Sequence, residues 1–349
     1  MSITLTPSRA PQPGLAGSDG KSRTRGALLD ALPTLASVAI LLLMFVYGEA
    51  AYGKIFQFNT LSNLFINSSA LIILAVGMTF VILTGGIDLS VGSVIAVSSL
   101  TGVFMANAGV PVAIALPVTI LVGAAFGLFS GVLVQYFNVQ PFIATLAMMF
   151  LARGIASIMA TTPIRLDDNS GFRALSEPIK LIDGPKTNDL VVTPSVLITL
   201  VVVIVAAVVL KRTRFGRTVY AIGGSENSAG LMGLPVAKTK LWVYTISGSL
   251  AGLAAVVYTS RTGIAQNVTG VGWELDAIAA VVIGGTMLTG GYGFVLGSVV
   301  GALVIGMMTL LITRDGSVPP EATTIITGGI LLAFVLLQRA VLLRKKNKA

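Results

Sequence analysis

Four ionisable side chains stand inside or beside long apolar stretches. Asp88 follows two glycines in LTGGIDLS, and Arg153 lies in FLARGIA. Glu274 and Asp276 open the stretch WELDAIAAVVIGG. A charge in apolar surroundings is costly, so each residue is a candidate for an ion pair or for contact with a ligand. Either acid of the last pair could be the counter-charge of Arg153.

Each charge has a structural and a functional interpretation. Asp88, with Ser90 two residues later, could cap the helix that follows by accepting backbone amide hydrogen bonds, or it could contact a partner or a transported molecule. Arg153 could form a structural ion pair or contact substrate. A carrier of protons or sodium usually has acids along its route, so the scarcity of charges favours a neutral polar cargo.

Several kinds of chemistry are excluded by what the chain lacks. There is no Cys, which excludes disulfides and thiolate catalysis, and no His, the commonest metal ligand and proton carrier. The stretch GSDGKS has Leu15 where a phosphate-binding loop needs glycine. The acids do not cluster at one membrane depth as a membrane enzyme would require. We therefore expect no enzyme, and no cofactor or metal in this chain.

The composition is that of a membrane protein. Of 349 residues, 54% are hydrophobic and 11% are charged, whereas soluble domains carry roughly 25% charged residues. Because a spanning helix needs about 20 apolar residues, we expect an all-α integral membrane protein with about ten transmembrane helices. They cover 28–47, 64–84, 90–107, 112–136, 142–160, 193–210, 240–258, 275–290, 293–312 and 323–343. The eighth is short and contains Gly284 and Gly285, which favours a broken or re-entrant segment.

The basic residues predict the orientation of the chain. Fifteen of the 23 Lys and Arg residues fall in a predicted disordered tail over 1–27, in a loop over 211–240, and in the C-terminal stretch that ends in a basic tail over 344–349. With ten spans in a membrane domain over 28–343, these segments lie on one side. The positive-inside rule places that side, with both termini, in the cytoplasm. We expect no nucleic-acid binding, because the basic residues are divided among segments that flank the membrane.

A fourteen-residue stretch occurs twice. LTGGIDLSVGSVIA at 83–96 and LTGGYGFVLGSVVG at 288–301 align without a gap, with seven identities. In the ten-span topology both copies follow a helix that runs inward, so they predict a parallel internal repeat of a helix–GG turn–helix unit. Paired glycines permit such a tight turn. The residues of the predicted turns are Gly85, Gly86, Asp88, Ser90, Gly290 and Gly291.

Glycines four residues apart predict close helix packing. The series are Gly123–Gly127–Gly131, Gly248–Gly252 and Gly297–Gly301. Small residues at this spacing let helix backbones approach each other. We expect these contacts within the bundle rather than between two copies of the chain.

The basic loop over 211–240 is predicted to hold a short helix outside the membrane. Ser225 can cap it, Glu226 stands in its first turn, and Gly233 and Pro235 can end it. Basic flanks hold such a helix out of the membrane, where it could dock a partner protein. An ordinary interfacial helix fits the same pattern.

Three stretches resemble the permease subunits of bacterial ribose-type sugar ABC importers, within the branched-chain-type permease superfamily. They are AVGMTFVILTGGIDLSVGSVIA at 75–96, TRFGRTVYAIGGSENSAGLMGLPV at 213–236 and GVGWELDAIAAVVIGGTMLTGG at 270–291. The resemblance covers roughly residues 64–345. The sequences of these stretches are most similar to those of permeases assigned to galactofuranose uptake.

This resemblance implies a multi-pass permease that moves a neutral monosaccharide across the bacterial inner membrane, with galactofuranose as the candidate sugar. It implies a periplasmic sugar-binding protein, a second permease copy or paralogue, surrounding membrane lipid, and an ABC ATPase that binds the ATP. The loop over 211–240 then resembles the segment that couples a permease to its ATPase, with Glu-Asn-Ser in place of the family's Glu-Ala-Ala. The candidate coupling residues are Ser225, Glu226, Asn227, Ser228, Ala229, Gly230, Leu231, Gly233, Leu234 and Pro235.

A sugar path should offer hydroxyl, amide and aromatic side chains. The candidates are Asn67, Ser68, Thr79, Gln140, Phe142, Asn267 and Trp273. The alternative function is a stand-alone secondary transporter of a small polar solute. It would need an ion-coupling residue in the membrane, and only Asp88, Arg153 and Asp276 could serve.

Overall fold

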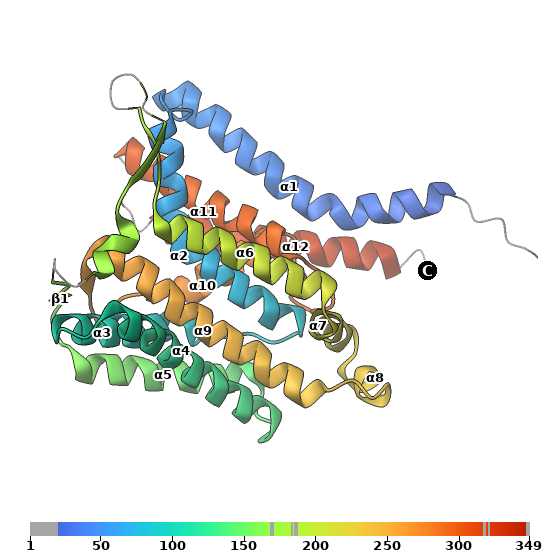
Figure 1. The fold of residues 1–349 in the computed structure, drawn as a ribbon. Coiled ribbons are helices and arrows are strands. Elements are labelled where there is room, and N and C mark those ends of the chain that lie inside the picture. The colour runs from blue at the N-terminus through green and yellow to red at the C-terminus, as the bar shows by residue number, and fades with distance from the viewer. Residues whose placement is uncertain are drawn as a thin grey trace, which may run out of the picture.

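The computed structural model describes residues 20–167, 171–182, 184, 188–316, 319 and 322–346, with side chains from Leu35 to Leu336 except at 322 and 323. The described chain is mainly helical (Figure 1). Its helices are α1 (Gly20–Tyr52), α2 (Phe58–Leu83), α3 (Val91–Asn107), α4 (Val112–Gln135), α5 (Pro141–Met159), α6 (Pro194–Arg212), α7 (Arg214–Gly224), α8 (Glu226–Leu231), α9 (Val236–Thr262), α10 (Trp273–Ile283), α11 (Val295–Asp315) and α12 (Ala322–Lys346).

The short strands form two antiparallel pairs outside the helices. β1 (Ile164–Arg165) pairs with β4 (Ile264–Ala265), and β2 (Ile179–Ile182) pairs with β3 (Leu190–Val192) around an irregular register. The 3-10 helix η1 (Phe172–Ser176) lies between β1 and β2 in sequence. α7 and α8 lie at one end of the bundle and β1 at the opposite end (Figure 1). We call these two ends the α8 end and the β1 end.

The expected all-α membrane fold is confirmed, and the number of long spans is corrected. All ten expected segments overlap a helix. Seven helices among the described residues are long and apolar enough to cross a membrane, namely α1, α2, α4, α5, α6, α9 and α11. α3 and the stretch Thr324–Leu336 of α12 are shorter apolar helices. α10 has 11 residues, or about 16 Å of helix, so the eighth segment is broken, as Gly284 and Gly285 indicated.

Helices extend into both predicted tails, and the boundaries of the membrane domain at 28 and 343 stay a prediction. α1 begins at Gly20, within the predicted tail over 1–27, and α12 continues to Lys346, within the predicted tail over 344–349. Residues 1–19 and 347–349 lie outside the described part of the chain.

Glycine permits the closest helix contact in the bundle. α4 and α9 pack along most of their lengths, and Gly123 and Gly127 of α4 meet Gly248 of α9. A Cβ on Gly248 would overlap the carbonyl oxygen of Gly123 and lie 2.8 Å from Gly127 Cα. Such contact between backbones explains the spacing of the glycines. The expected packing within the bundle is therefore present for this pair of helices.

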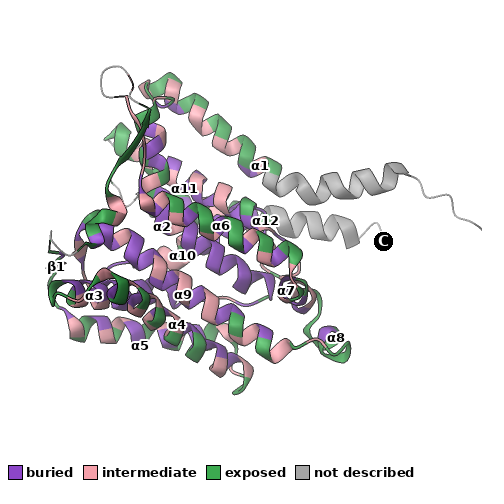
Figure 2. Cartoon of the chain, in the orientation of Figure 1, coloured by how far each residue is buried: buried purple, intermediate pink, exposed green. Residues whose placement is uncertain are grey.

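Burial differs sharply between the inner and outer helices. The interior part of α2 is almost entirely buried, and α10 buries an unbroken run from Ala277 to Ile283 (Figure 2). α1 lies at the edge of the bundle and exposes apolar side chains such as Leu43 and Val46. An apolar outward face suits contact with lipid, because lipid chains offer no hydrogen-bond partners to polar groups.

The predicted parallel repeat is not confirmed. In the first copy, α2 ends at Leu83, so its LTGG stands at the end of a helix. In the second copy α10 ends at Ile283, five residues before Leu288, and its LTGG lies in the loop that leads to α11. The reason is the break at Gly284 and Gly285: a Cβ on Gly284 would overlap the Gly297 carbonyl group, and Gly285 has a φ of 94°.

Candidate functional site

The short helix α8 has the start and the end that the sequence predicted. Ser225 is extended, with φ −166° and ψ 109°, and its Oγ accepts a hydrogen bond from the Ser228 backbone amide at 3.3 Å. Gly233 ends the turn with a φ of 73°, and its amide donates to the Gly230 carbonyl at 2.9 Å. Local capping thus fixes this helix between α7 and α9.

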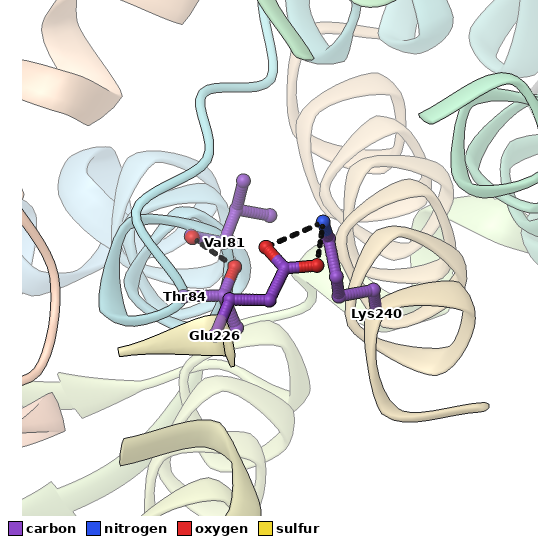
Figure 3. Close-up of polar contacts among 4 residues, drawn as sticks. All are labelled: Val81, Thr84, Glu226 and Lys240. Atoms are coloured by element: carbon purple, nitrogen blue, oxygen red, sulfur yellow. Dashed lines mark hydrogen bonds and ion pairs between the residues drawn. The ribbon is translucent and has the colours of Figure 1, made fainter. Parts of the chain in front are cut away.

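A salt bridge joins α8 to the start of α9. Lys240 Nζ lies 2.9 Å from Glu226 Oε1 and also donates to Oε2 at 3.0 Å. Figure 3 shows the Glu226 carboxylate facing the Lys240 ammonium group, and the Thr84 hydroxyl bonded to the Val81 carbonyl at the end of α2. The Lys240 side chain is only 13% exposed. The ion pair therefore holds α8 against a cation that is packed on the bundle.

The end of α8 exposes two large apolar side chains. Leu231 is 90% exposed and Met232 is 69% exposed, whereas Ala229 is buried beneath them. The exposed side also includes Asn227, Ser228 and Gly230. A large aliphatic side chain so exposed at a bundle end, next to basic residues, is suited to contact with another protein.

The two LTGG turns and α7 meet at the α8 end. The Gly291 amide donates to the Leu83 carbonyl at 3.0 Å, and a Cβ on Gly290 would lie 2.7 Å from the Gly85 nitrogen. Gly223 of α7 fits between the turns, because a Cβ there would overlap Leu83 O and Gly291 N. The two predicted copies are thus not equivalent in structure, but they contact each other.

Asp88 is fully buried beside this junction. Its Oδ1 accepts from the Ser90 amide at 3.0 Å and from the Ser90 hydroxyl at 2.6 Å. Its Oδ2 accepts from the Ser247 hydroxyl of α9 at 2.8 Å. The predicted hydrogen bond from a backbone amide to Asp88 is present, although the residue that immediately precedes α3 is Ser90. Through Ser247, Asp88 also connects α9 to the start of α3.

Arg153 is bound directly by backbone carbonyls, and Glu274 is its acidic neighbour. Its guanidinium donates to the carbonyls of Asn267 and Thr269, the latter at 2.9 Å. Of the two acids that the sequence suggested, Glu274 interacts with it electrostatically, but without an ion pair within 4.0 Å among the described residues. Arg153 thus holds the loop before α10.

A cavity of about 700 Å³ opens at the β1 end. The first half of α2, the last turn of α9, the start of α10 and the end of α11 enclose it. Trp273 and Tyr258 lie edge to face in its wall, with ring centroids 5.0 Å apart. Asp276 also lines it, so the cavity contains polar, charged and aromatic groups.

The seven candidates for a sugar path are divided between the two ends. Asn67, Ser68 and Trp273 line the cavity. Thr79 is buried between α2 and α11, where its hydroxyl donates to Ser298 at 2.7 Å. The remaining three lie elsewhere: Gln140 and Phe142 are exposed at the start of α5, and Asn267 is in the loop that Arg153 holds.

Sequence reasoning missed three residues that the α8 end depends on. They are Gly223, Ser247 and Tyr220, whose hydroxyl donates to the Gly293 carbonyl at 2.7 Å. The glycine pair at 223–224 was a signal of close approach. The serine and the tyrosine carry no such signal, because their partners are distant in the sequence.

Comparison with known proteins gives a consistent family. The family model described as "Branched-chain amino acid transport system / permease component" matches residues 60–335. The fructose import permease protein FruG of Bifidobacterium longum (strain NCC 2705) is 52% identical over 92% of this chain and 95% of its own length. The inner membrane ABC transporter permease protein YjfF of Escherichia coli (strain K12) is 38% identical, over 91% and 95%.

A third relative covers less of the chain. The ribose import permease protein RbsC of Escherichia coli (strain K12) is 39% identical over 78% of this chain and 83% of its own length. The family match at residues 60–335 includes all three stretches that carry the predicted motifs. This chain belongs to the family of permease components of branched-chain amino acid type transport systems.

Proposed function

We propose that this chain is the permease subunit of an ATP-driven importer that moves a neutral monosaccharide across a bacterial inner membrane. The similarity to sugar permeases over nearly the whole chain carries the proposal. Relatives named for fructose, ribose and allose transport match 92%, 78% and 85% of the chain. These cargoes share only their class, neutral monosaccharides. Galactofuranose stays a prediction within that class.

The orientation in this proposal follows from charge. Basic residues gather at the α8 end, on the last turn of α6, on α7 and at the start of α9. The positive-inside rule assigns that end to the cytoplasm. The cavity at the β1 end then faces the periplasm, where a sugar-binding protein would deliver its cargo.

The partner ATPase docks on α8. Leu231 and Met232 offer an apolar contact at the tip, and Ala229 below them packs the helix onto the protein. The capping bond of Ser225 and the ion pair of Glu226 keep the helix in one position when it is pushed. Leu231 and Met232 would then be the central apolar contact of the interface, where a few residues carry much of the binding energy.

Force applied to α8 has two routes into the bundle. The Glu226–Lys240 pair leads into α9, which packs on α2, α3 and α4. α7 leads through Gly223 to Leu83 and Gly291, at the junction of α2 with the loop before α11. Backbone contacts of this kind resist compression, because protein interiors are close-packed. ATP shifts the balance between the inward-facing and outward-facing states only by binding them differently.

Reconstitution tests the proposal. The chain is placed in liposomes together with its ATPase and binding protein, and uptake of labelled fructose, ribose and allose is measured. We expect uptake that needs ATP and stops with an ATPase variant that binds but does not hydrolyse ATP. Uptake by the chain alone under an ion gradient would contradict the proposal and support a secondary transporter.

A further inference from the structure

The cavity at the β1 end has the size of a small-molecule site. Its volume of about 700 Å³ lies within the roughly 300–1,000 Å³ that such sites span. It reaches from the first turn of α2 to Leu71, and along α11 from Arg314 to Ile305. The cavity therefore extends over several turns of both helices and is open on the side where Asn63 and Asn67 are exposed.

Several polar groups in its wall lack a partner within the protein. Across the described residues, no hydrogen bond or ion pair engages Asn67, Arg261 or the Asp276 carboxylate. The Ser68 hydroxyl is buried and also lacks a hydrogen-bond partner in the described part of the chain. Ser68 is buried and Asp276 is half-buried, and polar groups in such positions are normally paired. Asn67 and Arg261 are exposed at the open side of the cavity. Their arrangement around one space favours a ligand, or water that a ligand displaces.

The signs of the charges indicate the kind of ligand. The Asp276 carboxylate would repel an anion, and the Arg261 guanidinium would repel a cation. Arg314 is already engaged, since it donates to the Gly53 carbonyl at 3.1 Å and to the Thr60 hydroxyl at 3.0 Å. A hydroxyl group both donates and accepts. A neutral polyhydroxyl compound thus satisfies the carboxylate and the guanidinium at once.

The aromatic pair adds a surface for the apolar side of such a molecule. Trp273 and Tyr258 are both partly buried and fixed edge to face. A rigid aromatic ring offers a large apolar contact area, with a polar group at its edge. A sugar ring has one face of C–H groups and a rim of hydroxyls, so the aromatic and polar parts of the wall match its two kinds of surface.

We infer that this cavity is a binding site for a single neutral monosaccharide within the permease itself, with Trp273 against the apolar face of the sugar and Asp276, Asn67 and Arg261 on its hydroxyls. The inference rests on the proposed function, because only an importer of sugars has use for such a site. Binding is weak, since a cargo must also leave the site. The permease then selects its cargo a second time after the binding protein has released it.

Intrinsic fluorescence tests the site directly. The chain has two tryptophans, Trp273 in the cavity and Trp242, which is exposed on α9 near the α8 end. In full-length Trp242→Phe protein in nanodiscs, Trp273 is the only reporter. We expect a saturable change of emission with fructose, ribose or allose. The matched control, Trp273→Phe, keeps Trp242 and should show no change.

Two variants check the chemistry of the site. Asp276→Asn should raise the sugar concentration at the midpoint of the fluorescence change by about tenfold. This is the loss of affinity expected for one charge-assisted hydrogen bond. Asn67→Ala should weaken it by a smaller factor. In the complete complex both should raise the KM for uptake, while the ATPase activity stimulated by the binding protein is kept. Retained ATPase activity shows that the variants are folded and assembled.

The results separate the two proposals. No change of Trp273 emission at sugar concentrations that saturate uptake would overturn the inference, and the proposed function would stand. A response to galacturonate stronger than to neutral sugars, or one that follows added lipid instead of sugar, would also overturn it. A complex that hydrolyses ATP but imports no monosaccharide would contradict the proposed function, whatever the fluorescence shows.

Discussion

The two ends of the molecule differ in how closely their helices pack. At the α8 end, helices and turns meet backbone to backbone, and glycines such as Gly223 and Gly291 leave no space between them. At the β1 end, the helices separate around a cavity, and polar side chains such as Asn67 and Asp276 have no partner among the described residues. The first arrangement transmits a displacement without loss. The second admits water and a ligand, so the two tasks of an importer subunit are divided along its length.

The largest effect is expected at Gly223, where an added side chain would disrupt the close backbone packing of the α8 end. A Cβ in Gly223→Ala would overlap Leu83 O and Gly291 N, and such overpacking costs about 1–3 kcal/mol. Because both overlaps are with backbone atoms, we expect the upper end of this range, a fall in uptake of about 100-fold, together with a lower melting temperature of the purified chain. The control is Gly224→Ala, because nothing lies within 4 Å of a Cβ there. Equal behaviour of the two variants would disprove the role of Gly223.

The next effect is expected at the tip of α8. Leu231→Asp places a charge where the proposed docking contact is apolar, and loss of such an anchor costs about 2 kcal/mol, or roughly 30-fold in Kd. We expect weaker capture of the ATPase by the purified permease, with no change in sugar binding at the β1 end. Phe137→Asp is the matched control, since Phe137 is 70% exposed outside α7 and α8. Unchanged ATPase affinity in the Leu231 variant would place the docking surface elsewhere.

A moderate effect is expected from the ion pair that joins α8 to α9. Glu226→Lys places two lysines together at positions 226 and 240, where the structure has a contact of 2.9 Å. Exposed pairs are worth about 0.2–1 kcal/mol, so we expect a several-fold rise in ATP hydrolysed per sugar moved rather than a loss of insertion. The double exchange Glu226→Lys with Lys240→Glu should restore the ratio. Failure of the double variant to restore it would show that the pair itself is not the connection.

The smallest effect is expected at the β1 end, where Arg153 holds a loop without entering the cavity. Arg153→Gln keeps one donor but loses the bond to either Asn267 or Thr269. Because this loop leads to Trp273, we expect a rise of about two- to fivefold in the KM for uptake, in line with one net hydrogen bond. The maximal rate and the ATPase affinity should stay unchanged. A loss of ATPase affinity would mean that the two ends are not separable in this way.

The sequence was a good guide wherever structure is set by neighbouring residues. Ser225, Glu226 and Gly233 predicted the start and end of α8, because caps act over three or four residues. The glycine series predicted the contact of α4 with α9, because four-residue spacing places small residues on one helix face. The membrane class followed from composition alone.

Contacts over long distances could not be predicted from the sequence. Arg153 suggested an ion pair, and Glu274 does interact with it electrostatically, but its hydrogen bonds go to backbone carbonyls of a distant loop. The second LTGG suggested the end of a helix, but α10 stops at Ile283 because its next residue meets the backbone of α11. In each case the deciding neighbour belongs to another part of the chain, and no local pattern encodes it.

The extent of the cavity has a consequence for the barrier across the membrane. Its wall extends along α2 from Gln57 to Leu71, which is about 20 Å of helix. From Leu71 to the end of α2 at Leu83 only about 18 Å remain, against a hydrocarbon thickness of about 30 Å. With the proposed orientation, in which the cavity faces the periplasm, this remaining length of helix would form the seal between the two compartments. A voltage across the membrane would then fall mainly over that short segment.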